Sequence, residues 1–372
     1  MAEALEGIVI ADFSRVLAGP LATMVLADLG AEVVKVERPG TGDDTRGWGP
    51  PFDERGKATY FQAVNRNKRS VAIDLGDAAG AAAARELALR ADVLVENFRP
   101  GVMDDFGLGY DELHRERPDL IYCSLTGFGS RGEGAAMPGY DLLLQAVGGL
   151  MSITGDPDGE PQKVGVALVD VISGLFAAVG VLAALRHRER TGEGQRVEID
   201  LLSSLLAALV NQASAFTLAG VVAQRMGNSH PSVAPYEVLA TGDGEIVVAV
   251  GNDRQFAALA AALEDDALAR DQRFRTNSGR VAARAQLRAE LERALATRGA
   301  ADWVALLKRA RVPAAQINDI GGAFALAERL GLEPVASIER PDGTAARLAR
   351  NPIRLSVTPA TYRAAPPELG EG

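Results

Sequence analysis

Short apolar runs alternate with helical stretches along the first 130 residues. Strands are expected at Gly7–Phe13, Ala31–Arg38, Ala91–Asn97 and Asp119–Leu125, with helices at Gly19–Leu29, Gly76–Arg90 and Tyr110–Arg117. Buried strands that are joined through helices run parallel in one sheet, and their crossovers are right-handed. The pattern therefore predicts a Rossmann-like α/β layer, in which ligands bind beyond the carboxyl ends of the strands.

The pattern changes in the second half of the chain. Long helices are expected at Asp170–Arg190 and Leu201–Ala223 around a strand at Arg196–Asp200, then a hairpin at Tyr236–Thr241 and Gly244–Val250, then helices at Asp253–Leu263, Arg280–Arg298 and Ala300–Arg309. A chain of 372 residues exceeds the ~250–300 residues at which a single core stops growing. We therefore expect a smaller α+β domain after the long helices, and a strand at Pro352–Val357 that returns to the first domain.

Charge and cysteine content exclude several classes of protein. The chain carries 39 Lys and Arg against 49 Asp and Glu, a net charge of -10, so a nucleic acid would be repelled. The single cysteine, Cys123, allows neither an internal disulfide nor a thiolate cluster, and the first residues lack the pattern of a signal peptide. Val164–Leu185 and Leu201–Ala223 reach the ~20 residues of a spanning helix, but Asp170 and Asn211 interrupt them. We expect a cytoplasmic protein with no membrane or nucleic-acid partner.

Common metal and cofactor motifs are weak in this chain. The three histidines lack the spacing of metal ligands, so no metal site is expected. A G-x-G-x-x-G string at Gly127–Gly132 follows an expected strand, but residues 133–139 are poor helix formers, which disfavours a dinucleotide site. The basic stretch Asn65–Ser70 and Arg38 fall at the edge of the expected sheet. A solvated surface is their ordinary interpretation, and docking of a phosphorylated ligand is the alternative.

Asp170 opens a long apolar helix and is the carboxylate that most needs an explanation. As a helix N-cap it would accept hydrogen bonds from the first-turn amides, the ordinary role of Asp at such a position. The same geometry would suit a nucleophile, because the amides keep the carboxylate ionised while apolar surroundings strip its water. The residues alone leave both interpretations open, and the two are compatible.

Ordered blocks along the whole chain point to one family. They are Leu5–Phe13, Ala18–Pro20, Leu29–Pro39, Asn67–Ser70, Val95–Gly101, Gly139–Asp141, Val164–Gly165 with Asp170, and Arg190–Gln195. Together these blocks resemble the class III CoA-transferase family, also called the CaiB/BaiF family, which includes formyl-CoA transferases. The resemblance implies a large CoA-binding domain of residues 1–200 plus about 330–372, a small α+β domain of about 225–325, and a connecting helix at 201–224. It also implies an interlocked homodimer.

The activity that the resemblance implies is transfer of coenzyme A from an acyl-CoA donor to a small carboxylic acid acceptor. CoA would be a substrate moiety, and no permanently bound cofactor or metal would be needed. Asp170 matches the family's catalytic aspartate, which would pass through a mixed anhydride and a covalent aspartyl-CoA thioester. The positions that match the family's CoA contacts are Leu17, Ala18, Arg38, Ile73, Asp74, Leu75, Asn97, Phe98, Arg99, Gly139, Tyr140 and Asp141.

Departures from the family pattern narrow the substrate and leave alternatives. Leu17 stands where formyl and oxalate members carry glutamine, and residues 249–256 lack their tetraglycine loop, so oxalate is not expected. A 2-methylacyl-CoA racemase would need an imidazole base where this chain has Tyr140, a phenol that ordinarily titrates near pH ~10. A CoA-binding protein without catalysis would use the aspartate only as a cap. The sequence names neither acid, nor does it show whether Tyr140, Asp141 or Glu237 contacts the acyl group; Glu237 is expected on the solvent face of its strand.

Overall fold

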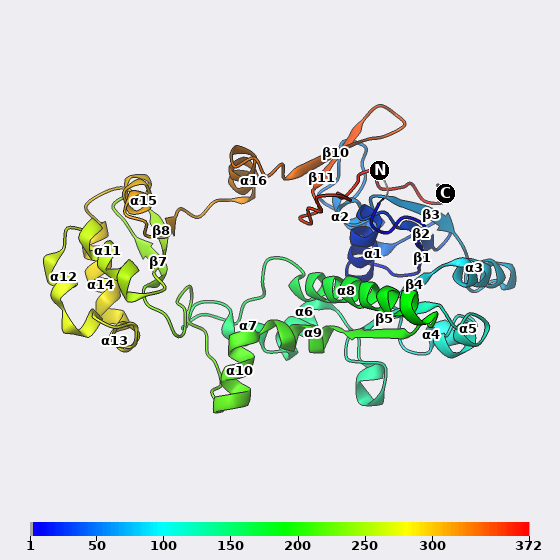
Figure 1. Cartoon of the computed structure of the whole chain (residues 1–372), viewed down its shortest axis with the longest axis horizontal. Coiled ribbons are helices and arrows are strands. Elements are labelled where there is room, and N and C mark those ends of the chain that lie inside the picture. Colours follow the sequence, from blue (N-terminus) through cyan, green and yellow to red (C-terminus); the bar gives the residue numbers. More distant parts are fainter. Residues whose placement is uncertain (1–2, 372) are drawn as a thin grey trace. The chain divides into compact units, whose positions relative to one another are not determined.

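Contacts divide the chain into two compact units in the computed structural model, which describes residues 3–371 (Figure 1). The first unit comprises the described residues up to Leu150, residues 163–221 and those from Glu333 onward. The second comprises residues 151–162 and 222–332. The C-terminal segment therefore belongs to the same compact unit as the N-terminal half of the chain.

The first unit is built on parallel strands that alternate with helices. Its elements are β1 (Val9–Asp12), α1 (Ala18–Asp28), β2 (Glu32–Glu37), α2 (Thr59–Ala63), β3 (Lys68–Ala72), α3 (Ala78–Arg90), β4 (Val93–Glu96), α4 (Val102–Asp105), α5 (Tyr110–Glu116), β5 (Ile121–Thr126), α6 (Asp141–Val147), α8 (Leu168–Thr191), β6 (Arg196–Asp200), α9 (Leu201–Ala208), α10 (Val210–Ala219), β10 (Val335–Glu339) and β11 (Ala345–Ala349). A short helix, α7 (Leu150–Ile153), falls where the two units meet in sequence. The alternation expected from the sequence is confirmed over the first 130 residues.

Six strands form one sheet in the order β3-β2-β1-β4-β5-β6, and every neighbouring pair is parallel. Apolar side chains of α1 and α8 pack on one face, where they meet Val93 and Val95 of β4. Those of α3 and α5 pack on the other face against Leu94. The strand order reverses between β1 and β4, and doubly wound sheets bind their ligands at such a point.

The basic stretch Asn65–Ser70 is not a solvated surface, and that interpretation is wrong. Every residue in it except Arg69 is buried, and its last part forms β3. Arg66 donates to both carboxylate oxygens of Asp28 at 2.9 and 2.6 Å, and the Lys68 Nζ lies 3.0 Å from the Asp12 Oδ2. These cations are neutralised inside the unit, so they are not free to hold a phosphorylated ligand.

Three further expectations from the second half of the chain are wrong. The segment expected as one helix at 201–224 is α9 followed by α10, which are bent by 84°, with Val210 at φ 40 between them. The expected helix Arg280–Arg298 is two helices. Pro352–Val357 forms no strand; the strands near this end are β10 and β11, which pair antiparallel. Proline at the first position removes a ladder donor, and the hydrogen bonds of this segment go to side chains such as Asn351 instead.

The second unit packs helices on a small antiparallel sheet. Its elements are β7 (Tyr236–Ala240), β8 (Glu245–Ala249), α11 (Asp253–Ala262), α12 (Asp266–Arg270), α13 (Asn277–Ala282), α14 (Arg284–Leu295), α15 (Ala300–Arg309), β9 (Ala314–Ala315) and α16 (Ile320–Arg329). The expected hairpin is confirmed, since β7 and β8 pair antiparallel. Leu239 and Ile246 of the hairpin pack with Leu291 and Trp303 in one core cluster.

One helix, α8, has the length and apolarity of a membrane span. Within its most apolar window, 44% of the helix is buried inside the structure. Ala177 and Val181 of α8 belong to the core on one face of the sheet. Core helices of water-soluble proteins pass the same test, so α8 is adequately explained as a core helix.

Candidate active site

Two neighbouring hollows open where the strand order reverses, at the carboxyl ends of β1 and β4. The chain leaves β1 through residues 13–17, and it leaves β4 through residues 97–100. Phe98 lines both hollows, so they adjoin along one edge of the sheet. This is the edge at which ligands of parallel α/β sheets bind.

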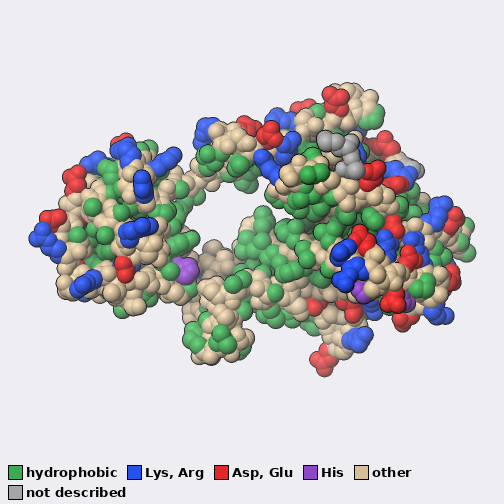
Figure 2. Space-filling view, in the orientation of Figure 1, with side chains coloured by type: hydrophobic (Ala, Val, Ile, Leu, Met, Phe, Trp, Pro, Cys, Tyr) green, Lys and Arg blue, Asp and Glu red, His purple; other side chains and the backbone are tan. Residues whose placement is uncertain are grey.

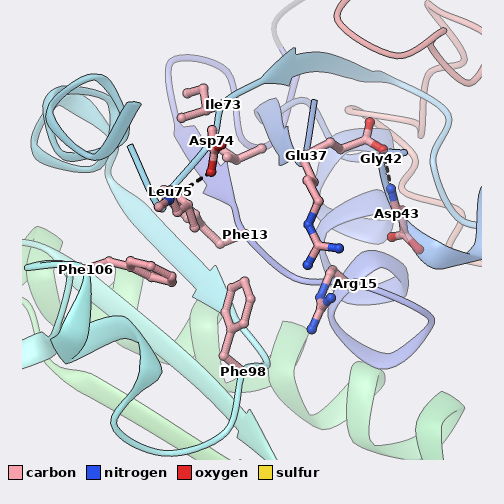
Figure 3. Close-up of a pocket in the computed structure, with 13 residues that line it drawn as sticks. Phe13, Arg15, Glu37, Gly42, Asp43, Ile73, Asp74, Leu75, Phe98 and Phe106 are labelled. Carbon is pink, nitrogen blue, oxygen red and sulfur yellow. Dashed lines mark hydrogen bonds between the residues drawn. The ribbon is translucent and has the colours of Figure 1, made fainter. Parts of the chain in front are cut away.

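The first hollow is a cavity of about 180 Å³ that opens to solvent. Its lining consists of Phe13, Arg15, Val36, Glu37, Arg38, Gly42, Asp43, Ile73, Asp74, Leu75, Gly76, Phe98 and Phe106. Figure 3 shows the Phe98 and Phe106 rings and the Arg15 guanidinium at this hollow, with the guanidinium carbon 5.0 Å from the Phe98 ring centre. Arg38 is exposed, and its side chain makes no hydrogen bond or ion pair within residues 3–371. Aromatic rings beside a free cation suit a phosphorylated nucleotide.

One wall of the first hollow is held rigid by Glu37. Its carboxylate accepts hydrogen bonds from the Arg46 guanidinium at 2.7 and 2.6 Å, from the Ser70 hydroxyl at 2.6 Å and from the Asp43 amide at 2.9 Å. Burial opposes ionisation here, but these donors and the Lys35 charge hold the pKa of Glu37 below its usual value. The Glu37 carboxylate is therefore fully engaged and does not pair with the exposed Arg38.

The second hollow contains Asp170. Its lining consists of Ala18, Asn97, Phe98, Arg99, Pro100, Leu125, Thr126, Gly127, Gly129, Gly134, Ala135, Met137, Gly139, Asp170 and Leu201. Among these lining residues Asp170 provides the carboxylate and Arg99 a cation, and neither histidine nor tyrosine is present. The hollow therefore places a single carboxylate in a glycine-rich setting that mixes polar and apolar groups.

Asp170 is not the N-cap of its helix, so the interpretation as a cap is wrong. The N-cap position of α8 is Ala167, and Asp170 is the third helical residue. No hydrogen bond or ion pair reaches its carboxylate from any described residue, so the amides do not keep it ionised. Burial and then the Asp141 charge raise the pKa of Asp170 to about 7. A carboxyl group with a strongly raised pKa in a hollow is a candidate functional residue.

Asp141 takes the capping role from outside the helix. Its Oδ1 accepts hydrogen bonds from the amides of Val169 at 2.8 Å and Asp170 at 3.4 Å. Its Oδ2 accepts from the Gln145 amide nitrogen at 2.7 Å, and Gln145 in turn accepts from the Val164 amide at 2.8 Å. The first turn of α8 is fixed in this way without using the Asp170 side chain.

The glycine string 127–132 forms part of a loop beside Asp170, not a dinucleotide fingerprint. It is followed by a 3-10 turn at Gly132–Ala136, and no α-helix begins there. The ends of the loop touch, because a side chain added at Gly127 would lie 2.5 Å from the Gly139 Cα. Only glycine allows this contact, which closes the loop over the second hollow.

The structure brings most of the expected site residues together. Arg38, Ile73, Asp74, Leu75 and Phe98 line the first hollow, and Ala18, Asn97, Phe98, Arg99, Gly139 and Asp170 line the second. Leu17, Tyr140 and Asp141 line neither of the two. Leu17 packs in an apolar cluster with Met24 and Val64, and Tyr140 is 63% exposed.

Glu237 does not face solvent, and that expectation is wrong. It is 2% exposed, and its Oε2 accepts a hydrogen bond from Arg288 at 3.1 Å. Its Oε1 has no partner among the described residues. Burial raises the pKa of Glu237, which Arg288 and Arg284 only partly offset. It belongs to the interior of the second unit.

Tyr60 is a residue near the site that the sequence did not point to. It lies on α2 and packs with Leu17 and with Val171 of α8. Burial, and then the charges of Asp170 and Asp141, raise its pKa, which places the phenol within electrostatic reach of both carboxylates. Its hydroxyl makes no hydrogen bond within residues 3–371, so it is free to donate one. No local pattern distinguishes this tyrosine in the sequence.

Residues 5–372 match the model of CoA-transferase family III. The chain is a family III CoA-transferase. It is 42% identical to the succinate--glutarate CoA-transferase of Agrobacterium fabrum, over 99% of this chain and 93% of that protein. It is 41% identical to the acetyl-CoA:oxalate CoA-transferase of Acetobacter aceti, over 86% of this chain and 82% of that protein. The crystal structure of a CAIB/BAIF family protein from Brucella suis matches it with a TM-score of 0.88 at 42% identity, covering 100% and 97% of the two chains.

The family membership confirms the resemblance seen in the sequence, and with it the class of enzyme. A CoA-transferase uses CoA as a substrate moiety, and the two hollows place an exposed arginine and a carboxylate along one sheet edge. The part of the chain that the structure describes holds no cluster of three or more His, Cys, Asp or Glu residues that could bind a metal ion.

Proposed function

We propose that this CoA-transferase exchanges CoA between an acyl-CoA and a free carboxylic acid through a covalent thioester on Asp170. The observation that carries the proposal is the unpaired carboxylate of Asp170, with a pKa of about 7, in the second hollow, which adjoins the first. A structural carboxylate would be paired, whereas a nucleophile needs a free lone pair.

The reaction would run through four balanced substitutions. The Asp170 carboxylate attacks the donor thioester carbonyl, which gives a mixed anhydride and expels CoA thiolate. The thiolate attacks the aspartyl carbonyl, which gives the aspartyl-CoA thioester and releases the donor as a carboxylate. The acceptor carboxylate then attacks this thioester and expels the thiolate again, and the thiolate attacks the acceptor carbonyl to give the new acyl-CoA and free Asp170.

The residues around Asp170 would assist by position and by exclusion of water. Each attack develops a negative oxygen, and donors aimed at it lower the barrier. The Tyr60 hydroxyl has no partner among the described residues and lies within electrostatic reach of the carboxylate, and the glycine loop lines the same hollow. Anhydrides hydrolyse readily, so the apolar lining of Met137 and Leu201 would protect the intermediate from water.

CoA would lie along both hollows. Arg38 would pair with a phosphate, Ile73 to Leu75 and Phe98 would line the nucleotide slot, and Ala18, Arg99 and Gly139 would contact the thioester end. Leu17, Tyr140 and Asp141 line neither hollow, so we propose no direct contact for their side chains. Replacement of Arg38 by Gln should weaken CoA binding, which calorimetry measures; the matched replacement of the exposed Arg90 should leave it unchanged.

For the acids, we propose succinyl-CoA as donor and a small dicarboxylic acid such as glutarate as acceptor. The support is the activity for which the relative from Agrobacterium fabrum is named. Oxalate stays in the test panel, because the relative from Acetobacter aceti is named for it. A panel of free acids with succinyl-CoA, read by mass spectrometry, gives the order of preference.

We also propose that the enzyme is a cytoplasmic homodimer with a Rossmann-like CoA domain. The support for a dimer is the apolar surface that α8 exposes, where Leu175, Phe176 and Val179 are 47%, 43% and 62% accessible. Figure 2 shows apolar side chains exposed over α8 and α10. Contiguous apolar surface of this kind marks an interaction site. Sedimentation of the purified protein measures the assembly.

Hydroxylamine trapping during turnover tests the proposal directly. A thioester or anhydride on Asp170 would be converted to a hydroxamate at that residue, which peptide mass spectrometry detects. An unmodified Asp170 in a protein that exchanges CoA would contradict the mechanism. Solvent deuterium in the α-position of recovered acyl-CoA would instead indicate the racemase activity, which needs a second acid or base that the lining of this hollow lacks.

A further inference from the structure

The turn that joins β1 to α1 contains a residue in a strained conformation. Val16 has φ 68, in the left-handed region that a β-branched residue rarely adopts. It lies between Arg15, which lines the first hollow, and Ala18, which lines the second. Strain of this kind persists only where the surroundings hold it, and it is concentrated at functional sites.

Asn97 holds the strained turn from the end of β4. Its Oδ1 accepts a hydrogen bond from the Arg15 amide at 2.8 Å, and its Nδ2 donates to the Arg15 carbonyl at 2.7 Å. Both ends of the side-chain amide are therefore engaged by one residue of the turn. A side chain used in this way acts on the backbone beside it, and a role as a ligand of CoA would compete with these bonds.

A buried ion pair holds the turn from the other side. The Asp43 carboxylate accepts hydrogen bonds from the Val16 amide at 3.4 and 3.3 Å and pairs with the Lys35 Nζ at 2.9 Å. The same Lys35 Nζ donates to the Ser14 carbonyl at 2.8 Å. Both charged side chains are fully buried. The polar backbone groups of residues 14–16 are thus bonded to side chains from β2, β4 and the loop after β2.

The turn determines where α1 begins relative to Asp170. Val16 and Leu17 pack with Tyr60, Ala167 and Val171, and the last two bracket Asp170 on α8. Gly174 lies one helical turn beyond Asp170, and a side chain there would come within 2.5 Å of the Ala18 carbonyl oxygen. The start of α1 is therefore seated directly against the helix that carries the nucleophile.

We propose that Asn97 is a positioning residue, which keeps the Ser14–Leu17 turn in its strained form so that the floor of the Asp170 hollow is built before substrate binds. This inference rests on the proposed function of Asp170. It assigns to Asn97 a role through the Val16 backbone, in place of direct contact with CoA. A displacement of such a floor by about 1 Å can reduce catalysis on the order of a hundredfold.

The test compares Asn97→Ala, Val16→Gly and the double variant. Glycine adopts a positive φ without strain, so Val16→Gly alone should change turnover by about twofold or less. Asn97→Ala should lower kcat by about tenfold or more with a much smaller change in the KM for acyl-CoA. The double variant should recover most of the lost kcat, because the relaxed turn no longer needs the hydrogen bonds of Asn97. The fraction of acyl-CoA lost to hydrolysis should rise in Asn97→Ala and fall again in the double variant.

Asn67 offers a matched control for loss of a buried amide. Its side chain also binds backbone groups, at Arg363, Ala364 and Thr361, on the other side of the unit. Asn67→Ala should reduce stability and leave the partition between transfer and hydrolysis unchanged. A rise in KM that accounts for the whole loss in Asn97→Ala, or the absence of recovery in the double variant, would overturn the proposal.

Amide hydrogen exchange separates this inference from the chemistry of Asp170. In the unliganded protein, Asn97→Ala should speed exchange of the Arg15 and Val16 amides, whether or not Asp170 is the nucleophile. If exchange rises but Asp170→Ala still transfers CoA, the proposed function is wrong and the positioning role of Asn97 is supported. If exchange is unchanged while hydroxamate forms at Asp170, the positioning role of Asn97 is wrong and the proposed function is supported.

Discussion

In the first unit Asp12 is fully buried and Asp170 is half-buried, and their pKa values move in opposite directions. Burial opposes the charge of Asp12, but Lys68, Lys35 and the hydroxyls of Ser14 and Thr23 override it and lower its pKa to about 2. Asp170 has no such partner, and its pKa rises to about 7. A buried carboxylate is thus structural or reactive according to what surrounds it.

The difference between these two sites follows from their places in the fold. Asp12 lies at the end of β1, where Lys68 of β3 is 3.0 Å from its Oδ2 and the charge of Lys35 of β2 also favours ionisation. Asp170 lies in the first turn of α8, where Asp141 takes the helix amides and adds a second negative charge. The protein neutralises the Asp12 carboxylate and leaves the Asp170 carboxylate without a partner among the described residues, which costs stability and, under the proposed function, keeps Asp170 available as a nucleophile.

The largest effect expected is on activity, from Asp170→Ala. Loss of the nucleophile should lower CoA transfer on the order of 10⁴-fold or more, because no other carboxylate lines the hollow. CoA binding should change little, since most of the contacts proposed for CoA lie in the adjoining hollow. Initial rates with succinyl-CoA and calorimetric titration with CoA measure the two quantities. Transfer at the normal rate by this variant would make the contrast with Asp12 irrelevant to function.

The next effect is on stability, from Asp12→Asn. The substitution leaves Lys68 buried without its counter-charge, which should cost about 3–5 kcal/mol of unfolding free energy. The pKa of Asp12 is lower in the folded state than in the unfolded chain, so its stabilisation is present above about pH 4 and is lost as the pH falls through about 2. Urea denaturation at pH 7 measures the cost. A loss below about 1 kcal/mol would mean that the ion pair is incidental.

The sequence was sufficient for the parallel α/β layer because its strands are buried on both faces and read as apolar runs. The apolar pattern did not predict β3, because Lys68, Arg69 and Ser70 are typical of a solvated surface. Their partners Asp12, Glu32 and Glu37 belong to other strands. No local sequence pattern indicates that a cation is neutralised by a carboxylate far away in the chain. Tertiary pairing, and not local polarity, decides the burial of such a segment.

The candidate site was predictable in its residues but not in its roles. Blocks of matching sequence pointed to Asp170, Arg38 and Phe98, which line the two hollows. They could not show that Asp141 caps α8 or that Asn97 binds the Arg15 backbone, because both depend on contacts between segments far apart in the chain. The strain at Val16 is likewise invisible in its residue type.

A smaller effect is the gain in stability expected from Asp170→Asn. The folded protein holds this carboxyl at a pKa of about 7 against 3.8 for the free group, so ionisation destabilises the fold as the pH rises through 7. The amide removes this cost. The free energy of unfolding of the variant should exceed that of the wild type by about 2–4 kcal/mol at pH 8 and should equal it near pH 4. Burial also raises the pKa of Glu96 to about 7. The stability of Glu96→Gln should therefore depend on pH in the same way, while CoA transfer is retained.

Denaturant titrations at pH 4.5 and pH 8 measure this difference for both variants. Equal stability of wild type and Asp170→Asn at pH 8 would mean that the Asp170 carboxylate has a partner in solution, which would remove the contrast with Asp12. If Asp170→Asn were less stable than the wild type at pH 8 only, ionised Asp170 would stabilise the fold, which is the reverse of the expected effect.

The smallest effect is a shift in the pH profile, from Asp141→Asn. Only ionised Asp170 can attack a thioester, so the rate of aspartyl thioester formation should rise with pH through about 7. Asparagine keeps an oxygen for the Val169 and Asp170 amides but removes the negative charge, which should move the acid limb down by about 0.5–1 pH unit. Glu116→Gln removes the same charge from an exposed pair with Arg85 and should leave the limb in place. Single-turnover rates between pH 5 and 8 measure the limb, and an unchanged or higher midpoint in Asp141→Asn would show that burial alone sets the reactivity of Asp170.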